Sequence, residues 1–175
     1  STNEELQSVN EELYTVNTEL QEKNQELTSV TNEIDNLLKS TDIGTLFLDS
    51  QLQIRKFTPS LSKHFSLEQS DVGRRISSFT STFNEKDRLR LIEDCEECLS
   101  RLSTIEQELT GEDGNIYFRR VSPFRTTDNK IEGVVITFVD ITKLKNAELA
   151  LKQSEVRFKS LFNELKDAFV YGNIE

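Results

Sequence analysis

Apolar side chains recur every seven residues through the first 38 positions of the chain. One position of the repeat carries leucine or isoleucine, and the position three residues later carries valine, leucine or once lysine. Five such heptads without a break predict a coiled coil, because the two positions form a narrow seam along one helix. The alternative, an amphipathic helix packed on a globular domain, would usually show a wider stripe. The predicted interface residues are Leu6, Val9, Leu13, Val16, Leu20, Leu27, Val30, Ile34 and Leu37.

The residues beside this seam predict the orientation of the partner helix. A glutamate precedes the leucine or isoleucine at the first seam position of every heptad, and asparagine occupies four successive positions on the other flank. In a parallel pair glutamate faces asparagine, whereas an antiparallel pair would stack glutamate against glutamate. We therefore expect a parallel homodimer, although Lys23 interrupts the seam and leucine with valine is not the combination most selective for dimers.

From Asp42 onward the seven-residue period gives way to strand-like runs and shorter helices. Glycine and asparagine mark the loops between the runs, and Asn84 stands where a helix N-cap would be. The order is two strands, helices, then three strands. The expected strands are residues 43–48, 52–57, 104–109, 116–124 and 131–139, with short helices or loops at 60–65 and 68–76 and a longer helix at 84–102.

A second helix with heptad spacing follows the last strand, over residues 143–168. Because the strand ends just before it, the first amides of the helix need an acceptor at once. We expect the Thr142 hydroxyl to supply it as N-cap. The Asp140 carboxylate should be favoured by the helix dipole and could pair with Lys143 or with an arginine such as Arg55.

Composition narrows the classes of function. The 175 residues suffice for one domain with extensions, and 31 acidic against 21 basic residues give a net charge of −10. This charge repels nucleic acid and anionic membranes, and no apolar run approaches the about 20 residues of a membrane helix. Cys95 and Cys98 are too few and too close to staple a secreted scaffold, so we expect a reducing, cytoplasmic setting. A chain that starts at Ser1 and lacks methionine suggests a piece of a longer protein.

Several motifs between Ile43 and Thr142 resemble those of PAS domains. They are the IGTLFLD opening, FTPS after the second strand, DVG before the connecting helices, the GEDG hairpin, and EGVVITFVDIT before the last helix. Asp140, Ile141 and Thr142 are similar to the DIT motif that closes the last PAS strand and starts the signalling helix. The resemblance implies an α+β fold, with a five-stranded antiparallel sheet and short helices on one face, usually around a small cavity.

The flanking helices carry further resemblances. The heptads NEELQSVNEELYTVNTELQEKNQEL are similar to the segment that links a methyltransferase unit to a PAS domain in bacterial chemotaxis methylesterase and methyltransferase fusion proteins. The tail from Ser154 is similar to the lead-in helix of a further PAS domain. We therefore expect a coiled-coil helix at residues 1–38, a PAS domain at 39–142, and an exit helix with the truncated start of a second PAS domain at 143–175.

Few side chains are available for catalysis or cofactor binding. Flavin photochemistry in PAS domains needs a cysteine on the connecting helices, where this sequence has none. His64 is the only histidine, and haem-binding relatives usually place theirs on the longer helix, so a surface or packing role is expected. Cys95 and Cys98 lie in mid-helix among acidic residues that raise a thiol pKa, and a zinc site would lack a fourth ligand. We expect no cofactor, no metal and no enzymatic activity in this part of the chain.

Phenylalanine is concentrated in the PAS-like region and would form either a plain core or the lining of a ligand cavity. Gln107 is the one polar strand residue expected to point inward, toward a ligand or a backbone group. The candidate lining residues are Phe47, Phe57, Phe79, Gln107, Phe118 and Phe138.

Two functions remain open at this point. The first is a dimeric PAS domain that relays conformational signals between the coiled-coil helices and neighbouring domains of a larger bacterial sensory protein. The second is a small-molecule sensor whose phenylalanine-lined cavity biases the same helices. We assign the relay to Asp140, Ile141 and Thr142, and we expect no nucleic acid or membrane partner.

Overall fold

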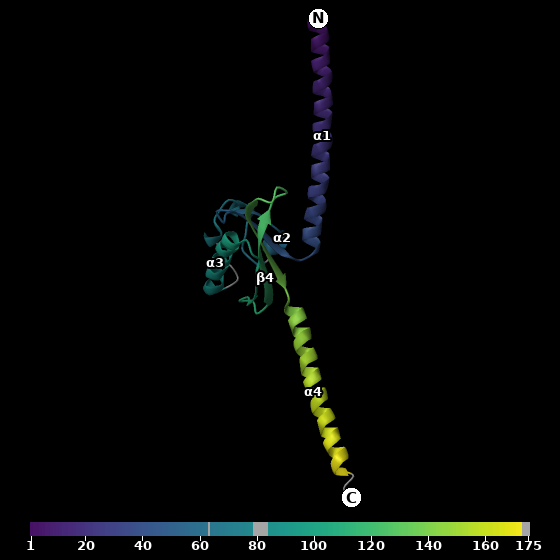
Figure 1. Ribbon diagram of the computed structural model, residues 1–175, viewed down its shortest axis with the longest axis vertical. Coiled ribbons are helices and arrows are strands. Elements are labelled where there is room, and N and C mark those ends of the chain that lie inside the picture. The colour runs from purple at the N-terminus through teal and green to yellow at the C-terminus, as the bar shows by residue number, and fades with distance from the viewer. Residues whose placement is uncertain (63, 79–83, 173–175) are drawn as a thin grey trace. The chain divides into compact units, whose positions relative to one another are not determined.

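A computed structural model describes residues 1–62, 64–78 and 84–172. The chain divides into two units, Ser1–Asp42 and Ile43–Glu175. Figure 1 shows their elements as ribbons. The elements are α1 (Thr2–Ser40), β1 (Gly44–Asp49), β2 (Ile54–Phe57), α2 (Pro59–Ser62), the 3-10 helices η1 (Gln69–Asp71) and η2 (Ile76–Ser78), α3 (Glu85–Arg101), β3 (Ile105–Thr110), β4 (Ile116–Arg125), β5 (Ile131–Asp140) and α4 (Thr142–Gly172).

The first unit is a single helix, α1, which has no buried residue within the chain. Threonine hydroxyls along it bond to backbone carbonyls four residues earlier, for example from Thr15 to Glu11. The seam residues are all exposed, from 47% for Val30 and Ile34 to 64% for Leu27 and Leu37. The predicted helix is present, and its pairing with a second chain stays a prediction.

The second unit is built on an antiparallel sheet of five strands in the order β2, β1, β5, β4, β3. The predicted α+β architecture is confirmed. β5 lies at the centre, because it pairs along its length with β1 on one side and with β4 on the other. The first two strands and the last three thereby join into one sheet around the last strand of the chain.

α2 packs against β1 and α3 against the last three strands, and both helices contribute to one core cluster on the same face of the sheet. Figure 1 shows α3 beside the sheet. Asn84 caps α3 as predicted, since its side chain accepts a hydrogen bond of 2.9 Å from the Asp87 amide. Leu102 ends the helix in the left-handed conformation. The core between the helices and the sheet comprises Leu46, Leu48, Ile54, Leu61, Phe65, Leu91, Cys95, Cys98, Tyr117, Val121, Val134, Ile136 and Phe138, among others.

Gly133 lies where the central strand β5 first pairs with β1, and only glycine fits at this position. It pairs with Asp49, and a Cβ atom at this position would lie 1.9 Å from the Leu48 carbonyl oxygen. Any side chain would therefore push the two strands apart. The absence of a Cβ allows the close backbone approach that the sheet requires.

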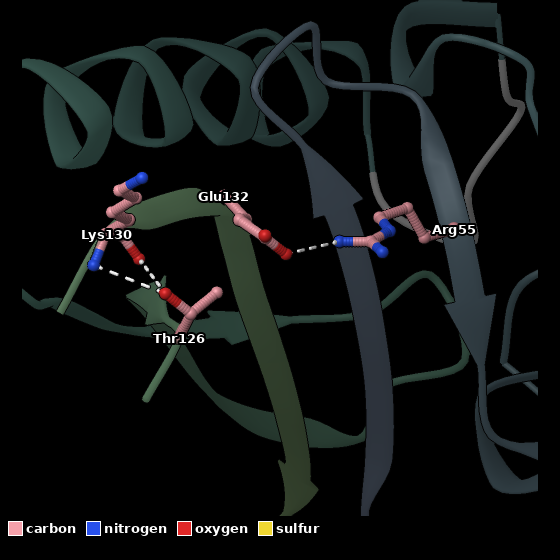
Figure 2. Close-up of polar contacts among 4 residues, drawn as sticks. All are labelled: Arg55, Thr126, Lys130 and Glu132. Carbon is pink, nitrogen blue, oxygen red and sulfur yellow. Dashed lines mark hydrogen bonds and ion pairs between the residues drawn. The ribbon is translucent and has the colours of Figure 1, made fainter. Parts of the chain in front are cut away.

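The polar contacts drawn in Figure 2 join β2 to β5 and close the β4–β5 hairpin. Arg55 of β2 donates to Glu132 of β5 at 3.3 Å, across the intervening β1. In the β4–β5 hairpin, the Thr126 hydroxyl bonds to both the amide and the carbonyl of Lys130, each at 3.3 Å. The hairpin predicted at residues 127–130 is thus closed by its flanking threonine. Across the described residues, no helix combines the length and the apolar character that a membrane crossing needs.

Candidate functional site

The start of α4 is tied to the sheet by a small polar cluster around Thr142. The Thr142 hydroxyl donates to Asp140 Oδ1 at 2.6 Å and accepts from the Ile116 amide at 2.9 Å. The Ile141 amide donates to the Ile116 carbonyl oxygen at 2.8 Å. The first residue of β4 therefore holds both the side chain that opens α4 and the backbone just before it. We call Asp140, Ile141, Thr142 and Ile116 the exit junction.

Two expectations about this junction are wrong in detail. Thr142 is the first residue of α4, and its hydroxyl turns toward β4 rather than capping the helix. The carboxylate of Asp140 provides the acceptor at the helix start, because it receives the Thr142 amide at 2.9 Å. Among the described residues Asp140 does not pair with Lys143 or Arg55: its carboxylate bonds to Thr142, and Arg55 bonds to Glu132 at the other end of β5.

An ion pair ties the first turn of α4 to the strand beyond β4. Lys145 Nζ lies 2.8 Å from Glu108 Oε1 on β3 and 3.8 Å from Glu148 on α4 itself. The hydrogen bond to Glu108 raises the pKa of Lys145 above its ordinary value. Because Lys145 is partly exposed and Glu108 is about half exposed, water screens the pair and its effect on stability is small. The pair does fix geometry, since it attaches α4 to β3 about one turn after the point where Thr142 attaches it to β4.

A second polar cluster lies one residue along β4, at Tyr117. The Tyr117 hydroxyl donates to Asp113 Oδ2 at 2.7 Å and lies 3.0 Å from His64 Nδ1. This hydrogen bond is the main cause that lowers the pKa of Asp113, while burial raises the pKa of Tyr117 to about 12. Since the hydroxyl proton goes to Asp113, His64 is the donor to the tyrosine oxygen. The single histidine thus has a packing and hydrogen-bonding role beside the junction.

The interior contains a charged group that the sequence analysis missed. Arg119 on β4 forms an ion pair with Asp94 on α3 and donates to Gln107 Oε1 on β3 at 2.7 Å. Its side chain is only 2% exposed, and its Nε atom is buried without a partner among the described residues. Burial lowers the pKa of Arg119, whereas Asp94 opposes this. Gln107 points inward as predicted, but it is not the one polar residue that does so.

The pattern of β4 could have revealed Arg119. Tyr117, Arg119 and Val121 alternate along the strand and are all buried, so an inward arginine follows from the period of two. On α3, Asp94 lies next to Cys95 and three residues after Leu91, on the apolar face. A buried cation and an acidic residue on facing elements indicate a pair, because neither is stable in the interior alone.

Burial controls the chemistry of the two thiols. It raises the pKa of Cys95 to about 12, against the opposing effect of nearby Arg119, and it also raises the pKa of Cys98. The acidic neighbours Asp94 and Glu96 raise the pKa of Cys95 further but contribute less than burial. Both cysteines are free and fully buried, which is the environment of an unreactive core thiol.

The predicted ligand cavity is nearly filled by side chains. A space of about 20 Å³ lies among core residues that include Leu46, Ile54, Phe65 and Phe138. A cavity of this size has room for about one water molecule. Of the predicted lining residues, Phe138 borders this space and packs on Phe65 with ring centroids 4.8 Å apart.

The other predicted lining residues lie elsewhere. Phe47 and Phe118 alternate with buried core residues of their strands, so they are on the face of the sheet that the helices do not cover. Phe57 is partly buried at the edge of the core, and Gln107 bonds to Arg119. Phe79 lies outside the described residues.

The uncovered face also bears an open groove of about 650 Å³. Phe47 and Phe124 form its apolar floor, with their rings edge to face and centroids 6.1 Å apart. Arg55 and Glu132, the pair drawn in Figure 2, are among its lining residues. The groove is open to solvent and offers no enclosed site for a small apolar ligand.

Comparisons with known proteins agree with this arrangement. Residues 34–142 match a family model described as a PAS domain. An uncharacterized 104.1 kDa protein from Rhodobacter capsulatus is 38% identical over 117 residues, which cover 67% of this chain and 12% of that protein. This chain therefore spans a small part of that relative's length.

Two solved structures share the fold at low sequence identity. A C-terminal domain from Streptococcus mutans has a TM-score of 0.53 at 14% identity and covers 67% of this chain and 89% of its own. The PAS domain of a protein from Colwellia psychrerythraea has a TM-score of 0.50 at 12% identity, with coverage of 65% and 98%. At these identities the likeness concerns the fold alone.

Proposed function

This chain belongs to the PAS domain family, and PAS domains are typically found in signal-transduction sensors. We therefore propose that it relays conformational signals from α1 to α4. The observation that carries the proposal is the exit junction. Thr142, the first residue of α4, bonds through its hydroxyl group to the amide of Ile116, the first residue of β4. A shift of β4 relative to β5 would therefore change the direction in which α4 leaves the sheet.

The contacts of the first helical turn support this role. Ile116 holds the backbone at Ile141 and the side chain of Thr142, and Glu108 on the next strand holds Lys145 one turn later. α4 is thus attached to two strands at two points about one turn apart, which fixes its phase as well as its position. Phase is the quantity that a coiled coil transmits, because its seam must face the partner helix.

The proposed relay works in a parallel homodimer. The exposed apolar seam of α1 supplies the entrance coiled coil, with its glutamate and asparagine flanks favouring parallel chains. α4 repeats apolar residues at heptad spacing from Leu144 to Leu165, and these are also exposed in the single chain. A dimer would bury both seams, and a rotation that enters through one would leave through the other.

The resemblance of α1 to the linker of chemotaxis fusion proteins suggests the wider setting. We propose that the parent is a larger bacterial sensory protein in which this module connects domains, some of them enzymatic, while the module itself performs no catalysis. The length of the 104.1 kDa relative, of which the match covers 12%, supports a large parent. The small interior cavity favours the relay over the alternative of a small-molecule sensor.

A phase-shift experiment tests the relay. Spin labels at Ser160→Cys would report the separation of the two α4 helices in the dimer, since the native cysteines are buried. Inserting four residues into α1 after Thr31 changes the phase of the entrance helix. We expect the insertion to shift the label separation in the native background and in Thr142→Ser, but to have a smaller effect in Thr142→Val.

The outcomes of this experiment separate the relay from a merely structural junction. An equal shift in Thr142→Val and in the native background would contradict the relay. If Thr142→Val does not fold, Lys145→Ala serves instead, because it removes the second attachment without touching the core. An unchanged separation after insertion in the native background would also overturn the proposal.

A further inference from the structure

We propose that a line of lysines on α4 binds a line of glutamates on α1 of a second copy of this chain. Both lines repeat every seven residues. The basic line consists of Lys145, Lys152, Lys159 and Lys166, and the acidic line of Glu5, Glu12, Glu19, Glu26 and Glu33.

Equal periods allow the two lines to match over their whole length. At a rise of about 1.5 Å per residue, successive charges on each helix are about 10.5 Å apart. A helix with a seven-residue apolar repeat supercoils, and supercoiling keeps each seventh residue on one face. When one lysine lies opposite one glutamate, the next pairs along both helices therefore meet as well.

Most of these charges have no ion-pair partner among the described residues of their own chain. Among the described residues, Lys152, Lys159 and Lys166 take part in no ion pair, and neither do Glu5, Glu12 and Glu19. Lys145 is engaged by Glu108, and Glu26 by Lys23. In the parallel dimer the glutamates would face asparagine, so pairing of α1 with itself would leave their charge unneutralised.

The net charges of the two helices also favour their association. α1 carries nine acidic and two basic residues, a net charge of −7, whereas α4 carries six basic and four acidic residues, a net charge of +2. Opposite net charges attract over the Debye length and favour encounter of the two helices. The lysine line is the part of the α4 surface at which this attraction would act.

The lysine line also lies beside apolar surface that the α4 seam does not use. Leu149 and Val156 occupy the heptad position opposite the seam residues Leu151 and Phe158, and they are 56% and 63% exposed. With Lys152 they lie on one open stretch of the α4 surface. An α1 helix placed there would cover Leu149 and Val156 with the aliphatic stems of its glutamates while their carboxylates reach the lysines.

Sedimentation velocity of the 175-residue chain in low and high salt provides the first test. Exposed ion pairs are individually weak and screened by salt, so three aligned pairs should strengthen association about tenfold at low ionic strength. We expect species larger than the seam dimer at 50 mM NaCl that disappear at 500 mM. Association that does not depend on salt would overturn the proposal.

Charge exchange gives the sharper test. The variant Lys152→Glu, Lys159→Glu, Lys166→Glu and the variant Glu5→Lys, Glu12→Lys, Glu19→Lys should each lose the larger species when measured alone. An equimolar mixture should regain them, because each variant then meets the opposite charge on the other. A mixture that behaves like the separate variants would overturn the proposal, including the case in which α4 contacts α1 of its own chain.

A control variant and a seam variant complete the design. Lys86→Glu, Arg90→Glu and Lys130→Glu change the net charge by the same amount away from α4 and should leave the association in place. Leu13→Asp with Leu20→Asp removes the seam but keeps both lines of charge. If the seam dimer is absent, association through the charge lines still appears as salt-dependent assembly, so failure of the two proposals can be distinguished.

Discussion

The guanidinium of Arg119 on β4 bonds to the carboxylate of Asp94 on α3 in the interior of the domain. Their side chains are 2% and 12% exposed, so the pair is screened little by solvent. Gln107 on β3 accepts a further hydrogen bond from the same arginine. The pair and this hydrogen bond thus join α3 to β4 and β3. Along β4, Arg119 lies two residues after Tyr117 and three residues after Ile116 of the exit junction.

Removal of Asp94 should destabilise the domain strongly. Asp94→Ala leaves Arg119 buried without its counter-charge, which typically costs about 3–5 kcal/mol. The double variant Asp94→Leu with Arg119→Met replaces the pair by apolar groups and should recover most of that loss. Urea unfolding followed by near-ultraviolet circular dichroism measures both, with Glu93→Ala on the exposed face of α3 as control. A small loss in Asp94→Ala would contradict the buried pair.

Loss of the Thr142 hydroxyl should open the exit junction. In Thr142→Val the Ile116 amide loses its acceptor, and a part-buried unsatisfied amide costs about 1–3 kcal/mol. We expect faster hydrogen exchange at Ile116, measured by NMR, and a matching loss of unfolding free energy. Thr142→Ser keeps the hydroxyl and should retain protection. Equal protection in both variants would show that the amide has another acceptor.

The pKa of Asp113 should depend on Tyr117. The tyrosine hydroxyl is the main cause that holds the pKa of Asp113 below its ordinary value of 3.8. A lowered folded-state pKa stabilises the fold above the ordinary pKa, and this contribution is lost as the pH falls through the folded value. In Tyr117→Phe the pKa of Asp113 should rise, which an NMR titration of the carboxyl group would detect. Tyr14→Phe on α1 should leave the Asp113 titration unchanged.

The two thiols should be unreactive in the folded protein. With the pKa of Cys95 raised to about 12 by burial, almost no thiolate is present at pH 8. A disulfide reagent such as Ellman's reagent should label neither Cys95 nor Cys98 before unfolding, and both in guanidinium chloride. Fast labelling of the native protein would contradict the buried position of these residues.

The coiled-coil seam of α1 should determine the basic oligomeric state. Leu13→Asp with Leu20→Asp places charges in an apolar interface and should yield monomers, because an unpaired buried charge is costly. Light scattering at 500 mM NaCl measures the mass. Thr18→Asp with Gln25→Asp adds the same charge at positions opposite the seam and should preserve the dimer. Retention of the dimer in the seam variant would move the interface to the sheet domain.

Local periodicity determined most of the secondary structure. The heptads of α1, the Asn84 cap of α3 and the strand-like runs are properties of neighbouring residues, so they can be read along the chain. The motif from Asp140 to Thr142 likewise located the start of the last helix within one residue. These features depend on contacts over a few positions, where propensity and pattern are informative.

Only the tertiary structure decided which side chains meet. β5 is apolar on both faces, so its sequence does not tell which residues face the helices, and the positions of Phe47 and Phe118 follow from strand register. Thr142 turns to Ile116 because β4 pairs beside β5, a contact between residues 26 positions apart. Arg119 pairs with Asp94 because α3 packs on the sheet against β4. Such contacts depend on the pairing of distant segments, which the local pattern of a single sequence does not encode.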